Sequence, residues 1–453
     1  MDKKINLSFN MVAIVCILLF SAVLAPITLQ NDTFYTIKIG EHILENGINM
    51  SNDPFSIHDI PYTYPHWLYD VAIYLIYSIS GMLGIYISTI VLSCILGVTM
   101  YFANKKIVKN DLVSFILTLG VMYVLGGFIA ARAQLFTYIL FTLQILFIEK
   151  FIETKKKRYA IGLIIIPIII ANVHLAVWPF YFVPFLPYIA EYLIALIIDA
   201  HVIQKFEIKL RKDEISKLYK IQEKQAKKIN LEQYTEERME KLKEEYKTDK
   251  EKIAELEKYN KTKEKIAKLE EQCRKRQEKF EESKEAGIKR RENPYKLKIE
   301  KRDNVKWLIL IIIICILTGL LTPLGDTPYT YLLKTMSGNT TKNINEHLPM
   351  VLIQSTYTII VLAIVLSILI FTDIKIKLKD LFMLGGLIIL ALMSKRQLSM
   401  LVLIGVYSVN RLVTDLFDKY DPERNKKIYK NNWKWFWQGN YITYNGTILY
   451  LHI

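Results

Sequence analysis

The stretch from Asn31 to Gly81, NDTFYTIKIGEHILENGINMSNDPFSIHDIPYTYPHWLYDVAIYLIYSISG, decides how the rest of the chain is arranged. It directly follows an apolar run at 10–29, and most of the chain after it is apolar or belongs to one highly charged insert. The stretch gathers acids, histidines and tyrosines beside a segment apolar enough for a membrane. We therefore expect the chemistry of the protein in this loop and in polar residues that return to the same face.

The composition is that of a helical membrane protein. Of the 453 residues, 52% are hydrophobic, and several apolar runs approach the roughly 20 residues that cross a hydrocarbon core of ~30 Å. The runs are continuous rather than alternating, which disfavours a membrane β-barrel. The formal charge of +15 lies in a few loops and one insert, as membrane orientation requires. The lipid bilayer is therefore the expected partner, and nucleic acid is not.

The apolar segment at the end of the quoted stretch decides the topology. From Trp67 to Ser80 a helix would be only about 21 Å long at about 1.5 Å per residue, which is too short to cross a bilayer. This piece is also rich in tyrosine, which prefers the membrane interface. One interfacial helix followed by a span near 82–103 is one interpretation, and two spanning helices that turn at Gly81 are the other.

Basic residues decide between these two interpretations. If 67–80 lies flat on the outer surface, the lysines after each even-numbered span face the cytoplasm, whereas a crossing there would place them all outside. The N-terminus, the charged insert and the C-terminus are then cytoplasmic, which points to a bacterial plasma membrane. The sequence thus predicts an all-α polytopic membrane protein with about ten transmembrane helices, near 10–29, 82–103, 112–130, 134–152, 159–173, 176–199, 305–323, 350–371, 381–394 and 398–413.

Four regions follow from this topology. They are an N-terminal transmembrane module at 1–199 with its external loop at 30–81, a cytoplasmic insert at 200–304, a C-terminal transmembrane module at 305–413, and a tail at 414–453. In the tail, the NWKWFW segment suits the inner membrane interface, and Asn445-Gly446 between β-prone residues indicates a hairpin.

The insert has the pattern of a helical coiled coil. It contains no glycine or proline between His201 and Ala286, and Tyr259, Ile266, Cys273 and Phe280 follow each other at intervals of seven residues. A single helix of this length would separate its ends by about 150 Å, so the insert must fold back, near Asn230 or near Thr248-Asp249. Self-association, docking of a protein through 205–300 and a merely solvated insert all remain open.

Three positions in the first external loop are candidates for catalysis. Asp32 could act as general base for an acceptor hydroxyl or could hold a divalent metal, and its structural alternative is a helix N-cap. Asp53 is a second candidate, although Asn52-Asp53-Pro54 also reads as a turn. His66 lies one helical turn before Asp70, and the two could form a proton-transfer pair or could simply solubilise an interfacial helix.

Further polar residues return to the external turns. Arginine at membrane depth is costly and usually marks a site or a cavity, and two guanidinium groups on the outer face suit a phosphate. Snorkelling to lipid headgroups is the alternative. The donor-phosphate candidates are Arg132, Gln134 and Arg396, and the substrate-site candidates are Asn172, His174, Glu346 and Asp70. For His174 and Glu346, helix capping is the competing role.

The order of these motifs resembles the GT-C superfamily of membrane glycosyltransferases. The resemblance rests on a first span, on Asp32 opening the segment DTFYTIKIGEHILENG, and on a second short helix after Tyr64-Pro65. The segments RAQLFTY from Arg132, NVH from Asn172 and TPLGDTPY followed by INEH also resemble a bacterial branch of that superfamily. The similarity covers the spanning parts, about three quarters of the chain, and not the insert or the tail.

The resemblance implies inverting transfer of a sugar, of the hexosyltransferase type, from a polyprenyl-phosphate-linked donor at the outer face of the membrane. Asp32 would then be the base or orient the acceptor, and Arg132 and Arg396 would hold the donor phosphate. The chain departs from the family at Thr33, where many relatives carry a second acid, and at Pro65-His66-Trp67-Leu68, where many have Pro-Pro-Leu. A transporter or lipid flippase, and a catalytically inactive scaffold acting through its cytoplasmic coil, are the alternatives.

Overall fold

The computed structural model describes residues 2–26, 30–48, 52–58, 62–199, 202–229, 236–245, 249–282, 295–337, 344–351 and 355–421. The described residues are almost entirely helical, as predicted, with one pair of two-residue strands, β1 (Leu297–Lys298) and β2 (Ile376–Lys377). The chain divides into two compact units, one formed by Met1–Tyr192, Tyr295–Leu297 and Arg302–Ile453, the other by Leu193–Pro294 and Lys298–Lys301. The features predicted for the tail lie outside the described residues.

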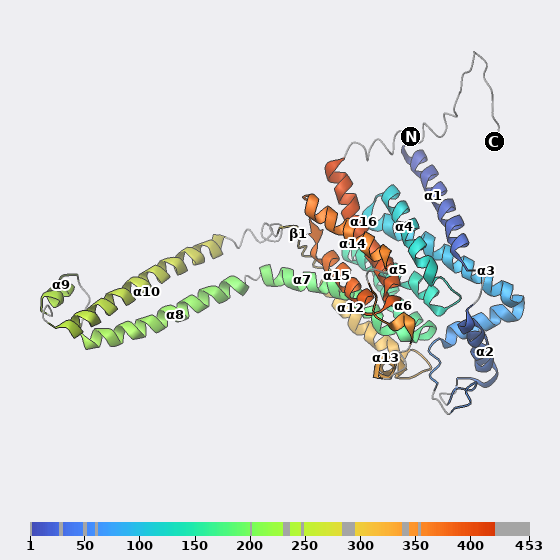
Figure 1. Ribbon diagram of the computed structural model, residues 1–453, viewed down its shortest axis with the longest axis horizontal. Coiled ribbons are helices and arrows are strands. Elements are labelled where there is room, and N and C mark those ends of the chain that lie inside the picture. Colours follow the sequence, from blue (N-terminus) through green and yellow to red (C-terminus); the bar gives the residue numbers. More distant parts are fainter. Residues whose placement is uncertain are drawn as a thin grey trace, which may run out of the picture. The chain divides into compact units, whose positions relative to one another are not determined.

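The first unit contains most of the helices (Figure 1). Its N-terminal part consists of α1 (Asp2–Leu24), α2 (Asn31–Asn46), α3 (Trp67–Val108), α4 (Asp111–Leu125), η1 (Gly126–Phe128), α5 (Ala133–Thr154), α6 (Lys157–Val173), η2 (Leu175–Phe185) and the start of α7 (Leu186–Asp199). Its C-terminal part consists of α12 (Val305–Leu317), η3 (Thr318–Leu320), α13 (Thr327–Ser337), η5 (Asn345–His347), α14 (Thr356–Phe371), α15 (Leu378–Met393), η7 (Lys395–Gln397) and α16 (Leu398–Tyr420).

The helices have the composition of membrane spans. Among the described residues, five helical segments are long and apolar enough to cross a membrane: Trp67–Val108, Asp111–Phe128, Ala133–Thr154, Leu175–Asp199 and Lys395–Tyr420. Three shorter apolar helices lie at Phe9–Leu24, Val305–Leu320 and Thr358–Phe371. A helix overlaps each of the ten predicted spans, but the number of crossings and the orientation stay predictions.

Helix α3 is broken where the sequence predicts a turn. Gly81 has φ 61° and ψ −154°, a conformation that an L side chain rarely adopts and that interrupts the helical backbone. The two arms of α3 consequently diverge at this point (Figure 1). The break at Gly81 is confirmed, whereas the flat position of the first arm on the membrane surface stays a prediction.

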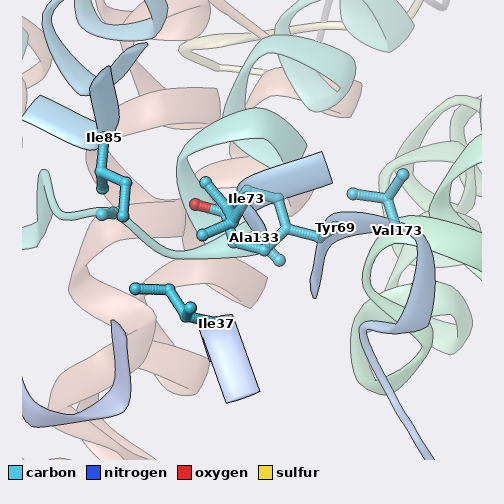
Figure 2. Packing of buried hydrophobic residues seen from close by; sticks show 7 residues of the cluster. Ile37, Tyr69, Ile73, Ile85, Ala133 and Val173 are labelled. Atoms are coloured by element: carbon cyan, nitrogen blue, oxygen red, sulfur yellow. The ribbon is translucent and has the colours of Figure 1, made fainter. Parts of the chain in front are cut away.

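Helix α2 packs closely against the first arm of α3. A Cβ atom on Gly40 would lie 2.1 Å from the backbone oxygen of Asp70, so only glycine permits this approach. The contact continues into a buried apolar cluster that reaches α5 and α6 (Figure 2), formed by Ile37, Tyr69, Ile73, Ile85, Ala131, Ala133 and Val173. On the other side of α2, Phe34 and Leu44 are each 51% exposed. The helix ends at Asn46, before Gly47 with φ 76°.

A cluster of charges is buried near the C-terminal end of α5. Glu149 accepts hydrogen bonds from Lys379 and from the hydroxyl of Tyr188 at 2.8 Å, and Arg411 Nη1 donates to it at 3.0 Å. Asp380 accepts from Arg411 Nε at 2.9 Å and from the hydroxyl of a serine on α16. We call Glu149, Lys379, Asp380, Arg411 and the neighbouring Arg302 the buried cluster, and every charge in it has an opposite partner.

The sequence did not reveal this cluster. Lys379 follows the predicted span at 350–371, and it is only 1% exposed and is paired with Glu149. A second set of ionisable groups therefore lies at the opposite ends of the helices that carry the predicted site residues. Glu149 and Arg411 stand inside apolar segments, and a charge in such a position is the signal that could have revealed the cluster.

The second unit is a helical hairpin. Helix α8 (Val202–Lys228) and helix α10 (Lys250–Glu282) run side by side (Figure 1), with the short α9 (Glu236–Glu245) between them in sequence. Arg276 pairs with Glu207, and Tyr219 donates to Glu270 at 2.7 Å, which makes the two helices antiparallel. The predicted fold-back is therefore confirmed.

The interior of the hairpin follows the predicted heptad in part. Tyr259, Ile266 and Cys273 are buried, at intervals of seven residues. Of the two predicted turn points, Asn230 and Thr248 lie outside the described residues, and Asp249 accepts from the backbone N–H of Glu251 at 3.2 Å at the start of α10. The supercoil of a true coiled coil stays a prediction.

Candidate functional site

Asp32, the first catalytic candidate of the external loop, contacts Arg132, one of the donor-phosphate candidates. Asp32 lies in the first turn of α2 and accepts a hydrogen bond from Arg132, which is one hundred positions away in the chain. The N-cap of α2 is Gln30, without a side-chain capping bond, so the structural interpretation of Asp32 as an N-cap is wrong. Arg132 itself precedes α5 in an extended conformation, so its side chain leaves the helix end toward α2.

A second carboxylate approaches the same guanidinium group. Arg132 Nη1 lies 3.7 Å from Glu346 Oε1, and Glu346 belongs to η5 in the second half of the chain. The Nε of Arg132 is buried and has no hydrogen-bond partner among the described residues. We call Asp32, Arg132, Glu346 and Arg396 the open cluster, because the last three line a cavity and Asp32 pairs with Arg132.

That cavity has a volume of about 370 Å³, and we call it the polar cavity after the charged and amide side chains in its wall, which apolar side chains complete. Charged and amide groups from three parts of the chain converge on it, namely Arg132 and Gln134 from α5, Asn345 and Glu346 from η5, and Lys395 and Arg396 from η7. Lys395 donates to the side-chain oxygen of Asn345 at 2.9 Å, which ties η7 to η5. The cavity thus joins the residues that the sequence placed at separate external turns.

A larger cavity of about 630 Å³ shares two lining residues with the polar one, Gln134 and Arg396. Aromatic and aliphatic side chains form most of its remaining wall, among them Tyr138, Phe141, Val177, Phe180, Leu390, Met393 and Met400. A polar cavity and an apolar cavity therefore meet at an amide and a guanidinium group. Such a pair fits an amphipathic molecule whose anionic group lies between a polar and an apolar part.

Two histidines lie together near this junction, and His174 lines the larger cavity. The rings of His66 and His174 are 5.0 Å apart, and His174 Nδ1 lies 3.2 Å from the hydroxyl oxygen of Thr137. Burial and, next, the positive charge of Arg396 lower the pKa of His66 to about 4, although Asp32 partly opposes this shift. Burial, with His66 and Arg396 next, also holds the pKa of His174 well below its ordinary value. Both rings are therefore uncharged near neutral pH.

Two other predicted candidates make contacts that hold the local backbone and helices in place. Asp53 accepts from the hydroxyl of Tyr35 and from the backbone N–H of Phe55, both at 2.9 Å, which matches the turn interpretation. Asn172 accepts from Trp67 Nε1 at 3.2 Å and donates to the carbonyl of Leu321 at 2.9 Å, so it fastens α6 to its neighbours. Both residues hold the site's framework.

Asp70 is separated from the histidine that was predicted to pair with it. It is only 2% exposed, and it contributes, after burial, to raising the pKa of Tyr62. In the described part of the chain, no side-chain hydrogen bond joins Asp70 to His66, whose ring instead faces His174. The candidate proton-transfer pair is therefore split between two environments.

Two residues of the site were not singled out from the sequence. Thr137 and Tyr138 follow Gln134 by three and four positions on α5, so all three share one face of the helix. Gln134 donates to the hydroxyl of Tyr138, and Thr137 meets His174. Polar side chains three and four positions apart within an apolar span are the sequence signal that could have identified them.

The chain offers little for a metal within the described ranges, where no group of three or more histidine, cysteine, aspartate or glutamate side chains is arranged to hold one.

Comparison with known proteins assigns this chain to no family. No family model matches the chain, and no curated protein is significantly similar to it. The functional argument therefore depends on the geometry above and on the motif order in the sequence.

Proposed function

We propose that this protein is an integral membrane glycosyltransferase that moves a sugar from a polyprenyl-phosphate-linked donor to an acceptor hydroxyl at the outer face of the plasma membrane. One observation carries the proposal: a cavity lined by Arg132, the partner of Asp32, shares Arg396 and Gln134 with a larger apolar cavity. The motif order that resembles the GT-C superfamily supports it from a separate direction.

The donor class follows from the two cavities. A lipid-linked sugar has a polar sugar, an anionic phosphate and a long apolar chain, in that order. The sugar suits the polar cavity, the phosphate suits the guanidinium group at the junction, and the first part of the chain suits the apolar cavity. Uncharged His66 and His174 beside the junction add hydrogen-bonding groups without adding charge.

The reaction assigns a proton-transfer role to Asp32. Its carboxylate would take the proton of the acceptor hydroxyl as the acceptor oxygen bonds to the anomeric carbon of the sugar. The bond between that carbon and the phosphate oxygen breaks at the same time, and the lipid phosphate leaves with the electron pair. Attack on the face opposite the leaving phosphate inverts the anomeric configuration.

The test uses the full-length protein in lipid nanodiscs, supplied with a polyprenyl-phosphate-linked hexose and membrane extract as acceptor. Release of lipid phosphate and sugar incorporation are followed together. We expect Asp32→Asn to reduce both rates by about 10²- to 10⁴-fold, the usual contribution of a general base. Glu41→Gln is the matched control, because Glu41 is an acid of the same helix that pairs with Lys38 on the surface.

Equal activity of wild type and Asp32→Asn would exclude this role of Asp32. Movement of intact lipid-linked sugar between leaflets, without release of lipid phosphate, would instead favour the flippase. Absence of both activities, with a phenotype that follows deletion of 205–300, would favour the scaffold.

A further inference from the structure

The two arginines of the open cluster have different surroundings. Arg132 lies between two carboxylates, those of Asp32 and Glu346. Arg396 has no carboxylate partner in the part of the chain that the structure describes, and it lines both cavities. We propose that Arg396 alone is the binding group for the donor phosphate, whereas Arg132 is a positioning residue that holds Asp32. This inference rests on the proposed function and assigns roles within its site.

Electrostatics favours this division. A phosphate that approached Arg132 would meet the negative charges of Asp32 and Glu346, and like charges at short range repel. The free Nε–H of Arg132 does not remove this repulsion, because both carboxylates border the same guanidinium group. The polar groups that share a cavity wall with Arg396 are different. Gln134 is an amide, His174 is uncharged near neutral pH, Lys395 adds a second positive charge, and Glu346 forms an ion pair with Arg132 rather than with Arg396 in the described structure.

The position of Arg396 also matches the order of groups in an amphipathic donor. The polar cavity and the apolar cavity have only Arg396 and Gln134 in common, so a molecule that occupied both would pass these two side chains. The backbone carbonyl of Arg396 accepts from the hydroxyl of Ser399 at 2.8 Å, which fixes the short η7 turn at the start of α16. Arg132, by contrast, lines the polar cavity alone.

The first test measures binding without any chemical step. Full-length protein in phosphatidylcholine nanodiscs is titrated with farnesyl phosphate, with farnesol and with inorganic phosphate. We expect wild type to bind farnesyl phosphate at least about tenfold more tightly than farnesol, the preference that a charge-assisted bidentate contact provides. Inorganic phosphate should compete only at far higher concentration, since it lacks the apolar chain.

The variants then separate the two arginines. Arg396→Gln should bind farnesyl phosphate no better than farnesol, with farnesol binding unchanged, whereas Arg132→Gln should keep the preference within about threefold. Lys38→Gln is the charge-matched control on α2, because Lys38 pairs with Glu41 and lines neither cavity. If Arg396→Gln does not fold, Arg396→Lys keeps the charge without the bidentate geometry and should weaken farnesyl phosphate binding several-fold.

Three results would overturn the assignment. They are a loss in Arg132→Gln as large as in Arg396→Gln, no preference of wild type for farnesyl phosphate over farnesol, and equal competition by inorganic phosphate. Sugar transfer provides the second readout, in which Arg132→Gln should lower kcat with little change in the donor KM and Arg396→Gln should raise that KM. Arg132→Lys should restore part of kcat, because an ammonium group can still hold Asp32.

The two proposals fail separately. If the binding results are as expected but no acceptor receives sugar, the glycosyltransferase assignment is wrong and Arg396 is still an anion-binding residue for an amphipathic lipid. If sugar is transferred but Arg132→Gln abolishes farnesyl phosphate binding, the division between the arginines is wrong and the enzyme assignment stands.

Discussion

The two ends of α5 carry charge clusters that are built in opposite ways. Arg132 of the open cluster and Glu149 of the buried cluster are separated by seventeen positions, about 25 Å along a helix. Helix α16 likewise begins just after Arg396 and contains Arg411 near its other end. In the buried cluster every charge meets an opposite charge away from solvent, whereas in the open cluster one guanidinium serves two carboxylates and the other has none in the described structure.

The charges of the buried cluster stabilise the fold, whereas those of the open cluster can change partners and so take part in binding or catalysis. A buried charge without its partner is strongly unfavourable, so the buried cluster must stay complete for the protein to remain folded. The open cluster is hydrated in part, with the Asp32 side chain 64% exposed, so its pairs contribute little to stability and can exchange partners. The following predictions test this contrast, from the largest expected effect on stability to the smallest.

Removal of one charge from the buried cluster should unfold the protein most readily. Lys379→Met leaves Glu149 without its closest cation and should lower the free energy of unfolding by about 3–5 kcal/mol. Denaturant unfolding in detergent measures the loss. The double variant Lys379→Met/Glu149→Leu should recover part of it, and equal instability of the single and double variants would contradict the pairing.

Displacement of α2 should damage the open cluster alone. Gly40→Ala places a Cβ against the backbone oxygen of Asp70 and should cost about 1–3 kcal/mol, as overpacked sites do. Because Asp32 lies on α2, sugar transfer should fall more than stability does. Gly120→Ala on α4 is the matched control, since its Cβ would meet nothing within 4 Å. Unchanged activity in Gly40→Ala would show that the seating of α2 does not position Asp32.

Acid should lower the free energy of unfolding through the histidines near the open cluster. In the folded chain the pKa of His66 is about 4, against an ordinary value of 6.5, so between these values only the unfolded chain binds the proton. The free energy of unfolding therefore rises by an amount on the order of 1 kcal/mol or more between pH 4 and pH 6.5. Above pH 6.5 this contribution is constant. Thermal unfolding across this range should show the slope, and His66→Gln should flatten it. An identical slope in that variant would exclude His66 as its source.

Loss of the exposed pair should have the smallest effect on stability. Arg132→Gln breaks the pair with Asp32, yet it should change the free energy of unfolding by only about 0–1 kcal/mol, the range of exposed ion pairs. The same unfolding assay measures this change. A loss comparable to that of Lys379→Met would mean that the two clusters do not differ in kind.

Local signals in the sequence predicted local structure well. Gly47 and Gly81 both have positive φ, where glycine is the residue that fits, and they end or break helices where they were expected to. The fold-back of the insert followed from the need to return a long helical chain to its starting face. Such features depend on neighbouring residues or on chain length alone, so one sequence contains the information.

For residues far apart in the chain, the sequence predicted which side of the membrane they share but not which of them are in contact. Topology placed Asp32, Arg132 and Arg396 on one side, but it could not distinguish an arginine between two acids from one without an acid. The burial of Lys379 was likewise beyond prediction, because it depends on Glu149, which lies on another helix. The periodicity of α2 also does not show whether protein or lipid covers an apolar side chain such as Phe34 or Leu44.

The antiparallel arrangement of α8 and α10 has a consequence for how the chain can change. The pairing of Glu207 with Arg276 brings the beginning of the hairpin next to its end. Because its two ends lie together, a hairpin insert of this kind can be shortened, lengthened or replaced by altering a single loop of the rest of the protein.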